Sequence, residues 1–514
     1  MTKAGSIGWF AAHEARLAWR DLLSLMTAGR RRSIRTVILG FLAFAVFMHA
    51  LAWLMLRTAA NVDGSDRKQV LVAITGGLLM AWSLMLSQAL ESVTRAFYAR
   101  GDLDLILSSP VAAERLFAVR IAAMAVAIVI MALGLAAPFI NVLAWFGGAG
   151  WLCAYVVAMA LAMVAVAVAV AATVGLFRLL GPRRTRAIAQ VVAAMVGAAF
   201  AITIQFAAIL SYGTTSRTAV MQSRELVEGS PDVDSPIWWP ARAVLGEPVA
   251  LFGLLGFGMI ALVLAIRVFA PRFGWLALTA GGQTHEMPAR RRRPSNFRAK
   301  SPAQALRRKE WVLLLRDPWL ISQTLMQLFY LLPAALLLWR SLQSGGQALG
   351  LLVPILIVAA GQLGGGLAWL AVSGEDAPEL IATAPVSANA VFRAKTEAVL
   401  GGIAAIFCPF VLLLAIAAPF AALVAMVGAL IAAASATAIQ YWFRTQARRS
   451  LFRRRQTSSR VATFSEAVSS TLWAATGAVA ATHSWLFVVP GLMVAVIVLG
   501  TWMISPARSA RALA

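Results

Sequence analysis

The sequence predicts an all-α, polytopic integral membrane protein with about twelve transmembrane helices in two parallel six-helix repeats. Of the 514 residues, 61% are hydrophobic and 13% are charged, whereas a soluble domain has about 25% charged residues. The apolar residues form runs of about twenty or more, long enough to cross a bilayer as helix. Helix is expected because lipid offers backbone groups no hydrogen-bond partner. A third observation, two local motifs that each occur twice, predicts the repeat.

The apolar runs divide the chain into two transmembrane halves, 36–271 and 320–514. Asn141 with Gly147, Gly148 and Gly150 marks the turn between the third and fourth spans of the first half, and Ala418-Pro419 marks it in the second. The expected spans are 36–56, 69–90, 121–140, 151–176, 188–211 and 249–270, then 320–340, 350–372, 397–416, 420–443, 464–483 and 485–504.

Basic residues are distributed unevenly between the predicted loops. With both termini in the cytoplasm, the outer loops hold 7 of the 45 Lys and Arg residues and an equal number of acids. The whole net charge of +24 then lies on the inner face, as expected of a bacterial-type plasma (inner) membrane protein. The charge therefore needs no nucleic-acid partner. We expect no cleavable signal peptide, because the first 35 residues lack an apolar core followed by a cleavage site.

Three stretches stand out among those outside the predicted membrane spans. Residues 1–35 are expected to form an amphipathic elbow helix and a basic anchor, and residues 272–319 a cytoplasmic linker and a second elbow helix. Residues 212–248 form the long outer loop, where a Trp-Trp-Pro sequence at 238–240 suits an interfacial turn or a re-entrant hairpin.

Two short motifs occur once in each half, at shifts of 296 and 275 residues. Both lie in polar segments, where a shared apolar bias cannot generate the match, so they indicate an internal duplication. The first precedes the first span of each half, and the second lies between the second and third spans. The coinciding residues are Glu14 with Glu310, Leu17 with Leu313, Arg20 with Arg316, Asp21 with Asp317, Asp104 with Glu379, Leu105 with Leu380, Pro110 with Pro385, Val111 with Val386, and Arg120 with Lys395.

Each motif has a functional and a plainer interpretation. The first is expected to form a helix lying in the membrane surface, or else a solvated juxtamembrane helix. The second occupies the inner loops 94–120 and 373–396. There Pro110 and Pro385 are expected to begin short helices, because the missing N–H of proline is not needed in a first helical turn. Such a helix with exposed apolar residues suits docking of a partner; the plainer interpretation is an ordinary structured loop.

These motifs resemble those of the type-2 ABC exporter (ABC-2 type) permease family. Members typically have six spans per half, an amphipathic helix before the first, and an inner loop close to Glu-x-Gly-Thr-Leu-Glu-Leu-Leu-Leu-x-Ser-Pro-Val. Residues 100–111, with Arg120 following, resemble that loop, whereas the second copy departs from it at Ala377 and Pro378. The resemblance covers the topology of the whole chain but, at residue level, only four short stretches.

The resemblance implies that each inner loop forms a coupling helix that fits a cleft of a nucleotide-binding subunit. One chain would supply the full membrane unit for two copies of a separate ATP-binding cassette subunit, with unequal docking sites. The docking residues so implied are Asp104, Leu105, Pro110, Val111, Glu114, Arg115, Glu379, Leu380, Pro385 and Val386. The elbow-helix residues are Glu14, Arg20, Asp21, Glu310, Arg316 and Asp317.

The chain itself is not expected to be an enzyme or to carry a cofactor. None of its five lysines follows the glycine-rich turn of a phosphate-binding P-loop, so ATP hydrolysis is expected only on partner subunits. The four histidines are scattered, and Cys153 and Cys408 lie in apolar runs, so neither a metal site nor a disulfide is expected. The substrate is open: the spans suit a lipid, a hydrophobic drug or a peptide, and a polysaccharide or an ion remains an alternative.

Other classes of protein share some of these features. The main alternative is a 12-span secondary transporter not driven by ATP, although its coupling residues usually lie deep in the bilayer. Here the acidic residues of the spans, Glu91, Glu397 and Glu466, lie near predicted inner ends. A membrane-embedded enzyme acting on lipid-linked substrates and a non-transporting scaffold are minor alternatives.

Overall fold

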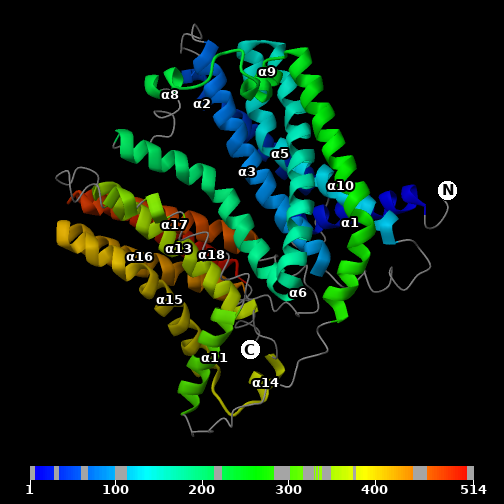
Figure 1. The fold of residues 1–514 in the computed structure, drawn as a ribbon. Coiled ribbons are helices and arrows are strands. Elements are labelled where there is room, and N and C mark those ends of the chain that lie inside the picture. Colours follow the sequence, from blue (N-terminus) through cyan, green and yellow to red (C-terminus); the bar gives the residue numbers. More distant parts are fainter. Residues whose placement is uncertain are drawn as a thin grey trace. The chain divides into compact units, whose positions relative to one another are not determined.

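The structure is a computed structural model of residues 1–514, drawn as a ribbon in Figure 1. The residues that it describes form helices and turns, and no strand occurs among them. Nine helices in this part of the chain are long and apolar enough to cross a membrane, which confirms an all-helical, multi-span protein. The described residues are 6–27, 34–59, 67–98, 113–212, 223–282, 301–316, 329, 331–333, 335–338, 349–373, 378–443 and 460–505.

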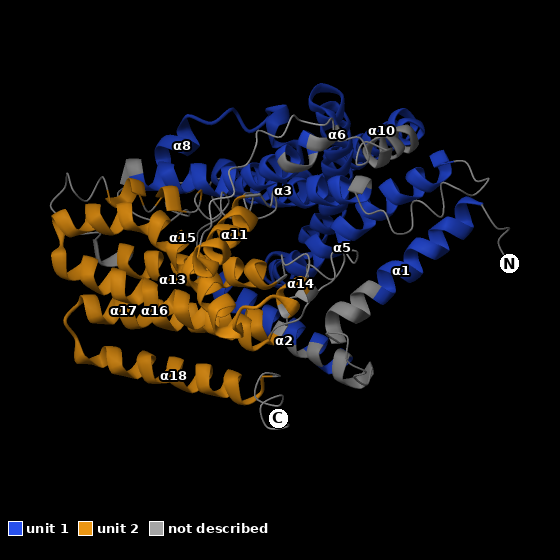
Figure 2. Cartoon of the chain, turned by 90° about the horizontal axis from the view of Figure 1, so that it is seen from below, with its two compact units in different colours: residues 1–290 blue, residues 291–514 orange. Residues whose placement is uncertain are grey.

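The chain folds as two compact units, shown in separate colours in Figure 2. Unit 1 comprises residues 1–290 and unit 2 residues 291–514. The division between them lies inside the predicted cytoplasmic linker, 272–319. Each unit has its own helical core and is described on its own.

Unit 1 is built around α6, which packs along α3, α5 and α10. A cluster of buried apolar side chains from α1, α3, α5, α6 and α10 forms its core. The helices of the unit are α1 (Ile7–Thr27), α2 (Ile34–Ala59), α3 (Arg67–Tyr98), α5 (Ala113–Gly147), η1 (Ala149–Leu152), α6 (Cys153–Tyr212), α8 (Arg224–Glu228), η2 (Pro236–Trp238), α9 (Trp239–Val244) and α10 (Pro248–Gly282).

Three glycines in unit 1 take backbone conformations that other residues rarely adopt, and two of them lie at helix breaks predicted from the sequence. Gly181 has φ 73° and interrupts α6, between the predicted spans 151–176 and 188–211. Gly148 has φ 92° and separates α5 from η1, at the predicted turn between the third and fourth spans. A positive φ is nearly free for glycine because it has no Cβ. Both breaks therefore follow from the sequence.

Unit 2 is a bundle in which α13, α16 and α17 pack on one another, with α15 beside α16 and α18 beside α17 (Figure 2). The helices are α11 (Pro302–Arg316), α13 (Leu349–Ser373), α14 (Pro378–Thr383), α15 (Ala388–Ala417), α16 (Pro419–Trp442), α17 (Arg460–Ala481), η4 (Trp485–Phe487) and α18 (Val488–Met503).

Small residues bring the central helices of unit 2 close together. An added Cβ at Gly364 of α13 would lie 3.0 Å from the Cα of Ala433 on α16. The side chain of Ile357 fits between two further glycines, because a Cβ at Gly428 or Gly477 would lie 2.4 or 2.2 Å from its Cδ1 atom. Small residues at such contacts let helix backbones approach closely, which is the usual means of packing helices in lipid.

Nine of the predicted spans coincide with the nine candidate spans of the structure. The other three differ. The predicted span 320–340 lies mostly outside the described residues, and 36–56 falls on α2, whose apolar helix is Phe44–Arg57. The span 464–483 coincides with α17, which is helical but too polar to be among the nine. The count of twelve therefore stays a prediction.

Candidate functional site

The two predicted elbow helices, α1 and α11, each form an ion pair with the helix that follows a predicted docking loop. In unit 2 the Nζ of Lys395 on α15 lies 3.1 Å from the carboxylate of Glu310 on α11. Glu310 is 1% exposed and Lys395 8% exposed. A second cation, Lys309, donates to the same carboxylate at 3.3 Å. The buried carboxylate is therefore compensated from two sides, as a buried charge requires.

Lys395 also donates to the carbonyl oxygen of Ala371, two residues before the end of α13. Its ammonium group thus joins three helices: α11 through Glu310, α13 through Ala371, and α15, on which it lies. The segment 374–387 leaves the bundle at α13 and returns at α15. Lys395 therefore connects α13 and α15, the helices on either side of this segment, to α11, the predicted elbow helix.

Unit 1 contains the corresponding contact. The Nε of Arg120 on α5 donates to the Oε1 of Glu14 on α1 at 3.1 Å, and both side chains are largely buried. Glu14 corresponds to Glu310 and Arg120 to Lys395 in the two motif alignments. In each unit, a residue of the first duplicated motif therefore forms an ion pair with a residue of the second.

The pairing itself was not predicted from the sequence. By sequence, Glu14 and Glu310 belong to the predicted elbow helices, and Arg120 and Lys395 are basic residues after the predicted inner loops. The useful signal was the opposite charge of these two positions in both copies, since duplicated partners tend to keep complementary charge. This signal identifies the contact only once elbow and loop are compared together.

The second predicted docking loop contains a short helix, α14, whose Leu380 side chain is 71% exposed. The prediction that Pro385 begins a helix is wrong: α14 begins at Pro378, and Pro385 lies in the bend before α15. Pro378 occupies the first position of α14, where the missing backbone N–H of proline is not needed for a hydrogen bond. Ser387 caps α15 instead, accepting a hydrogen bond from the Ala390 N–H at 3.2 Å. Pro385 is exposed and Val386 half-buried.

Both predicted docking loops are shorter than expected, because the flanking helices extend beyond the apolar runs. Helix α3 continues to Tyr98, supported by the pair of Glu91 with Arg95 at 2.6 Å, and α5 begins at Ala113. Glu114 is consequently an exposed residue in the first turn of α5 rather than part of a loop, followed by exposed Arg115.

Several predicted site residues fall outside the described part of the chain. Arg20 is described and is an exposed residue of α1. Asp21, Arg316 and Glu379 lie on helices, but their side chains are not described. The residues wholly outside the described ranges are Asp104, Leu105, Pro110, Val111 and Asp317.

A second ion pair joins α11 to α15 at the surface of unit 2. The Nη2 of Arg307 donates to Glu397 Oε1 at 3.0 Å, and Arg307 Nε donates to the other carboxylate oxygen. The hydrogen bond and charge of Glu397 raise the pKa of the Arg307 guanidinium. Both side chains are about half exposed, so this pair contrasts with the buried pair between the same two helices.

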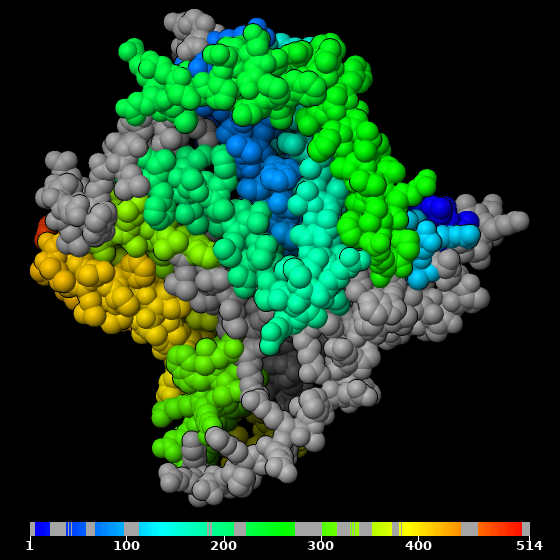
Figure 3. Space-filling model, in the orientation of Figure 1, coloured from blue at the N-terminus to red at the C-terminus, as the bar shows by residue number. Residues whose placement is uncertain are grey.

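The described part of the predicted outer loop, residues 223–247, forms a folded cap on unit 1. In the space-filling view its green residues cover the upper ends of the blue and cyan helices (Figure 3). Trp238 is buried against Leu71 of α3 and donates its Nε1–H to the Asp232 carbonyl at 3.0 Å. The predicted turn at 238–240 is thus built from two short helices, η2 and α9.

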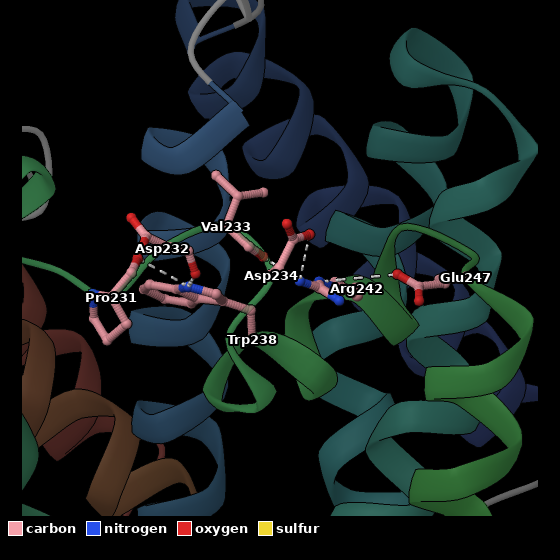
Figure 4. Close-up of polar contacts among 7 residues, drawn as sticks. All are labelled: Pro231, Asp232, Val233, Asp234, Trp238, Arg242 and Glu247. Carbon is pink, nitrogen blue, oxygen red and sulfur yellow. Dashed lines mark hydrogen bonds and ion pairs between the residues drawn. The ribbon is translucent and has the colours of Figure 1, made fainter.

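Arg242 of α9 is the central polar residue of the cap (Figure 4). Its Nη2 donates to the carbonyl oxygen of Val233 and lies 3.5 Å from Asp234 Oδ1. Its Nε lies 4.0 Å from a carboxylate oxygen of Glu247, just before α10. One largely buried guanidinium therefore joins the cap segment 231–234 to the start of α10.

Unit 2 also contains a second buried carboxyl, besides that of Glu310. The carboxyl of Glu466 on α17 is 8% exposed and accepts a hydrogen bond from Gln440 Nε2 of α16 at 2.5 Å. Among the described residues no group of three or more His, Cys, Asp or Glu side chains is placed to hold a metal ion.

Comparison of the chain with protein-family models, curated proteins and solved structures finds no match.

Proposed function

We propose that the chain is the membrane-spanning permease subunit of an ATP-binding cassette exporter, driven by separate ATP-binding subunits. The observation that carries the proposal is the ion pair between elbow helix and post-loop helix, present in both units. It supports duplication, because both members of the pair coincide in the two halves.

The pair also supports a mechanical role for the elbow helices. Lys395 links α11, α13 and α15 at the base of the segment that carries α14. A force on α14 then acts on three helices together instead of bending one loop. Breaking a buried ion pair by removing one partner costs about 3–5 kcal/mol. This free energy is comparable to the several kcal/mol needed to shift a two-state equilibrium almost completely. The contacts of Lys395 can therefore stay intact while a movement of α14 is passed on to α11, α13 and α15.

In the proposed mechanism two ATP-binding subunits close on ATP and push the segments 99–112 and 374–387. Exposed Leu380 of α14 provides the apolar contact in the second segment, and Leu105 is its counterpart in the first. The two halves then move against each other and open an outward path for the substrate. Both docking segments lie on the side with the high Lys and Arg content, which is cytoplasmic by the positive-inside rule.

The docking assignment is tested by affinity purification of the full chain in mild detergent, with quantification of any ATP-binding protein bound. We expect two copies on the unmodified chain. Leu380→Asp should reduce the number to one, and its combination with Leu105→Asp and Pro110→Gly should remove both. Ala305→Asp, on the exposed surface of α11, introduces the same charge and serves as the control. Unchanged stoichiometry in the combined variant rejects the docking assignment.

The main alternative is a 12-span secondary transporter, and one observation favours it. Ion-coupled carriers place ionisable residues inside the bilayer, and Glu466 is buried among helices of unit 2. The two functions differ in whether an ATP-binding protein purifies with the chain. Transport by the purified chain alone in proteoliposomes, without ATP, would favour the alternative.

A further inference from the structure

The polarity of α17 is reversed with respect to that of a helix in a soluble protein. Phe464 is 72% exposed, whereas four polar residues of the helix lie in its buried stripe; Thr463 and Thr471 are exposed. A helix with its polar side turned away from the surroundings is expected where those surroundings are lipid, and polar groups on that side mark functional positions. The buried polar residues are Ser465, Glu466, Ser469 and Ser470.

The Glu466 carboxyl is enclosed by neighbouring helices. Gln440 of α16 donates to its Oε2 atom at 2.5 Å. On the α13 side the carboxyl lies over Gly365, where an added Cβ would be 1.9 Å from its carbon and from Oε1. A hard cation such as Ca²⁺ takes six or more oxygen ligands, and the described residues include no group of three or more His, Cys, Asp or Glu side chains around this carboxyl. The group that fits is the smallest cation, a proton.

Among the described side chains of the helices packed around this carboxyl, none places a positive charge beside it. By sequence, α13 and α18 contain no ionisable residue, and α16 contains only Tyr441. On α15, Lys395 is bound to Glu310, and Arg393 and Glu397 are exposed. The side chain of Arg460, at the start of α17, and the basic residues between 444 and 459 lie outside the described residues.

An ionised carboxylate in such a site carries an effective desolvation penalty of several kcal/mol, which a single amide donor does not offset. A neutral carboxylic acid avoids the penalty. Its carbonyl oxygen accepts the Gln440 N–H, and its O–H needs an acceptor. The hydroxyls of Ser469 and Ser470, three and four residues further along α17, are buried and have no hydrogen-bond partner among the described residues, so they have acceptor capacity to spare.

We propose that Glu466 is a proton-binding site in the helical core of unit 2, with Gln440 donating to the carbonyl oxygen of the neutral acid. Release of the proton leaves a carboxylate that must gain water or a cation. The contact of α17 with Gly365 of α13 has to open for either to enter. Proton occupancy is thereby coupled to the packing of α13, α16 and α17. The sequence of α6 in unit 1 contains no acidic residue, so the site belongs to unit 2.

The test is infrared spectroscopy of the full chain, labelled with ¹³C-glutamate, in lipid nanodiscs. We expect the spectrum at pH 7 to contain a carboxylic-acid C=O band that disappears in Glu466→Gln and decreases as the pH is raised. A difference in the carboxylate region instead, with no acid band, overturns the proposal. This measurement does not depend on binding of ATP-binding subunits. Its result therefore tests the proton-binding site independently of the proposed function.

Thermal unfolding provides a second measurement. A proton held in the folded state but not in the unfolded state stabilises the protein at low pH, and this stabilisation is lost as the pH rises. Glu466→Gln mimics the neutral acid, so we expect it to keep the low-pH melting temperature and to remove the pH dependence. A melting temperature far below that of the unmodified chain at every pH would show that the charged form is required, and would overturn the proposal.

Two adjacent glycines provide a matched control for the geometry. Gly365→Ala places a methyl group against the carboxyl, whereas a Cβ at Gly366 has nothing within 4 Å. We expect Gly365→Ala to shift the acid band and Gly366→Ala to leave it unchanged. Equal spectra for the two variants would show that the carboxyl does not lie over Gly365, which also overturns the proposal.

Discussion

Breaking the buried pair of Glu310 with Lys395 should destabilise unit 2 much more than breaking the exposed pair between the same helices. Lys395→Met leaves the Glu310 carboxylate, 1% exposed, with Lys309 as its remaining cation. Glu310→Gln leaves the Lys395 ammonium with the Ala371 carbonyl. Losing one partner of a buried pair costs about 3–5 kcal/mol. We expect the lower end for Lys395→Met, because Lys309 stays 3.3 Å from the carboxylate.

These free energies correspond to large shifts in melting temperature. For a domain of this size about 1 kcal/mol lowers the melting temperature by about 2–4 °C, so the single variants should melt about 6–20 °C lower. The measurement is thermal unfolding in detergent at a single scan rate, since membrane proteins often unfold irreversibly. Arg307→Met and Glu397→Gln, which break the half-exposed pair, should leave the melting temperature unchanged because exposed pairs contribute little.

The double variant Lys395→Met with Glu310→Gln distinguishes pairing from simple damage to the core. It leaves neither charge buried alone, so it should be more stable than the sum of the single effects, with a coupling free energy of about 1–3 kcal/mol. Additive single effects, or an equal response of the buried and exposed pairs, would refute the reasoning. The same cycle at Glu14 and Arg120 in unit 1 is expected to show coupling of the same sign.

Two further predictions concern helix packing and the cap on unit 1. Gly477→Ala places a Cβ 2.2 Å from Ile357 Cδ1 and should destabilise the folded protein by about 1–3 kcal/mol through overpacking. Adding Ile357→Val, which removes that atom, should restore the melting temperature. Failure of the double variant to do so would exclude this clash. Arg242→Met should lower hydrogen-exchange protection across the cap by about 10- to 100-fold, because it removes charged hydrogen bonds of about 1.5–3 kcal/mol in total; unchanged protection would mean that Arg242 does not hold the cap to α10.

The spans and their turns were predictable because their signals are local. A window of apolar residues determines whether a segment can cross lipid, and a glycine with positive φ, such as Gly148 or Gly181, ends a helix whatever lies around it. The position of the short helix α14 was missed for a related reason. Both Pro378 and Pro385 can begin a helix, and the sequence alone does not determine which one does.

Contacts between distant helices were not predictable from local patterns. Glu310 and Lys395 are 85 residues apart, and their pairing depends on how α11 lies against α15. Gln440 and Glu466 likewise meet only because α16 packs on α17.

The sequence by itself determined the membrane class, most helix positions and the duplicated motifs, because hydropathy and turn chemistry act over a few residues. The tertiary structure decided which side of each helix is buried. On α17 the hydropathy of the segment averages a polar stripe with an apolar one and indicates only a weak span, whereas packing turns the polar stripe, with Glu466, into the core. The mean hydropathy of a helix does not say to which side each residue points. That side determines whether a charged group faces lipid, water or a partner residue.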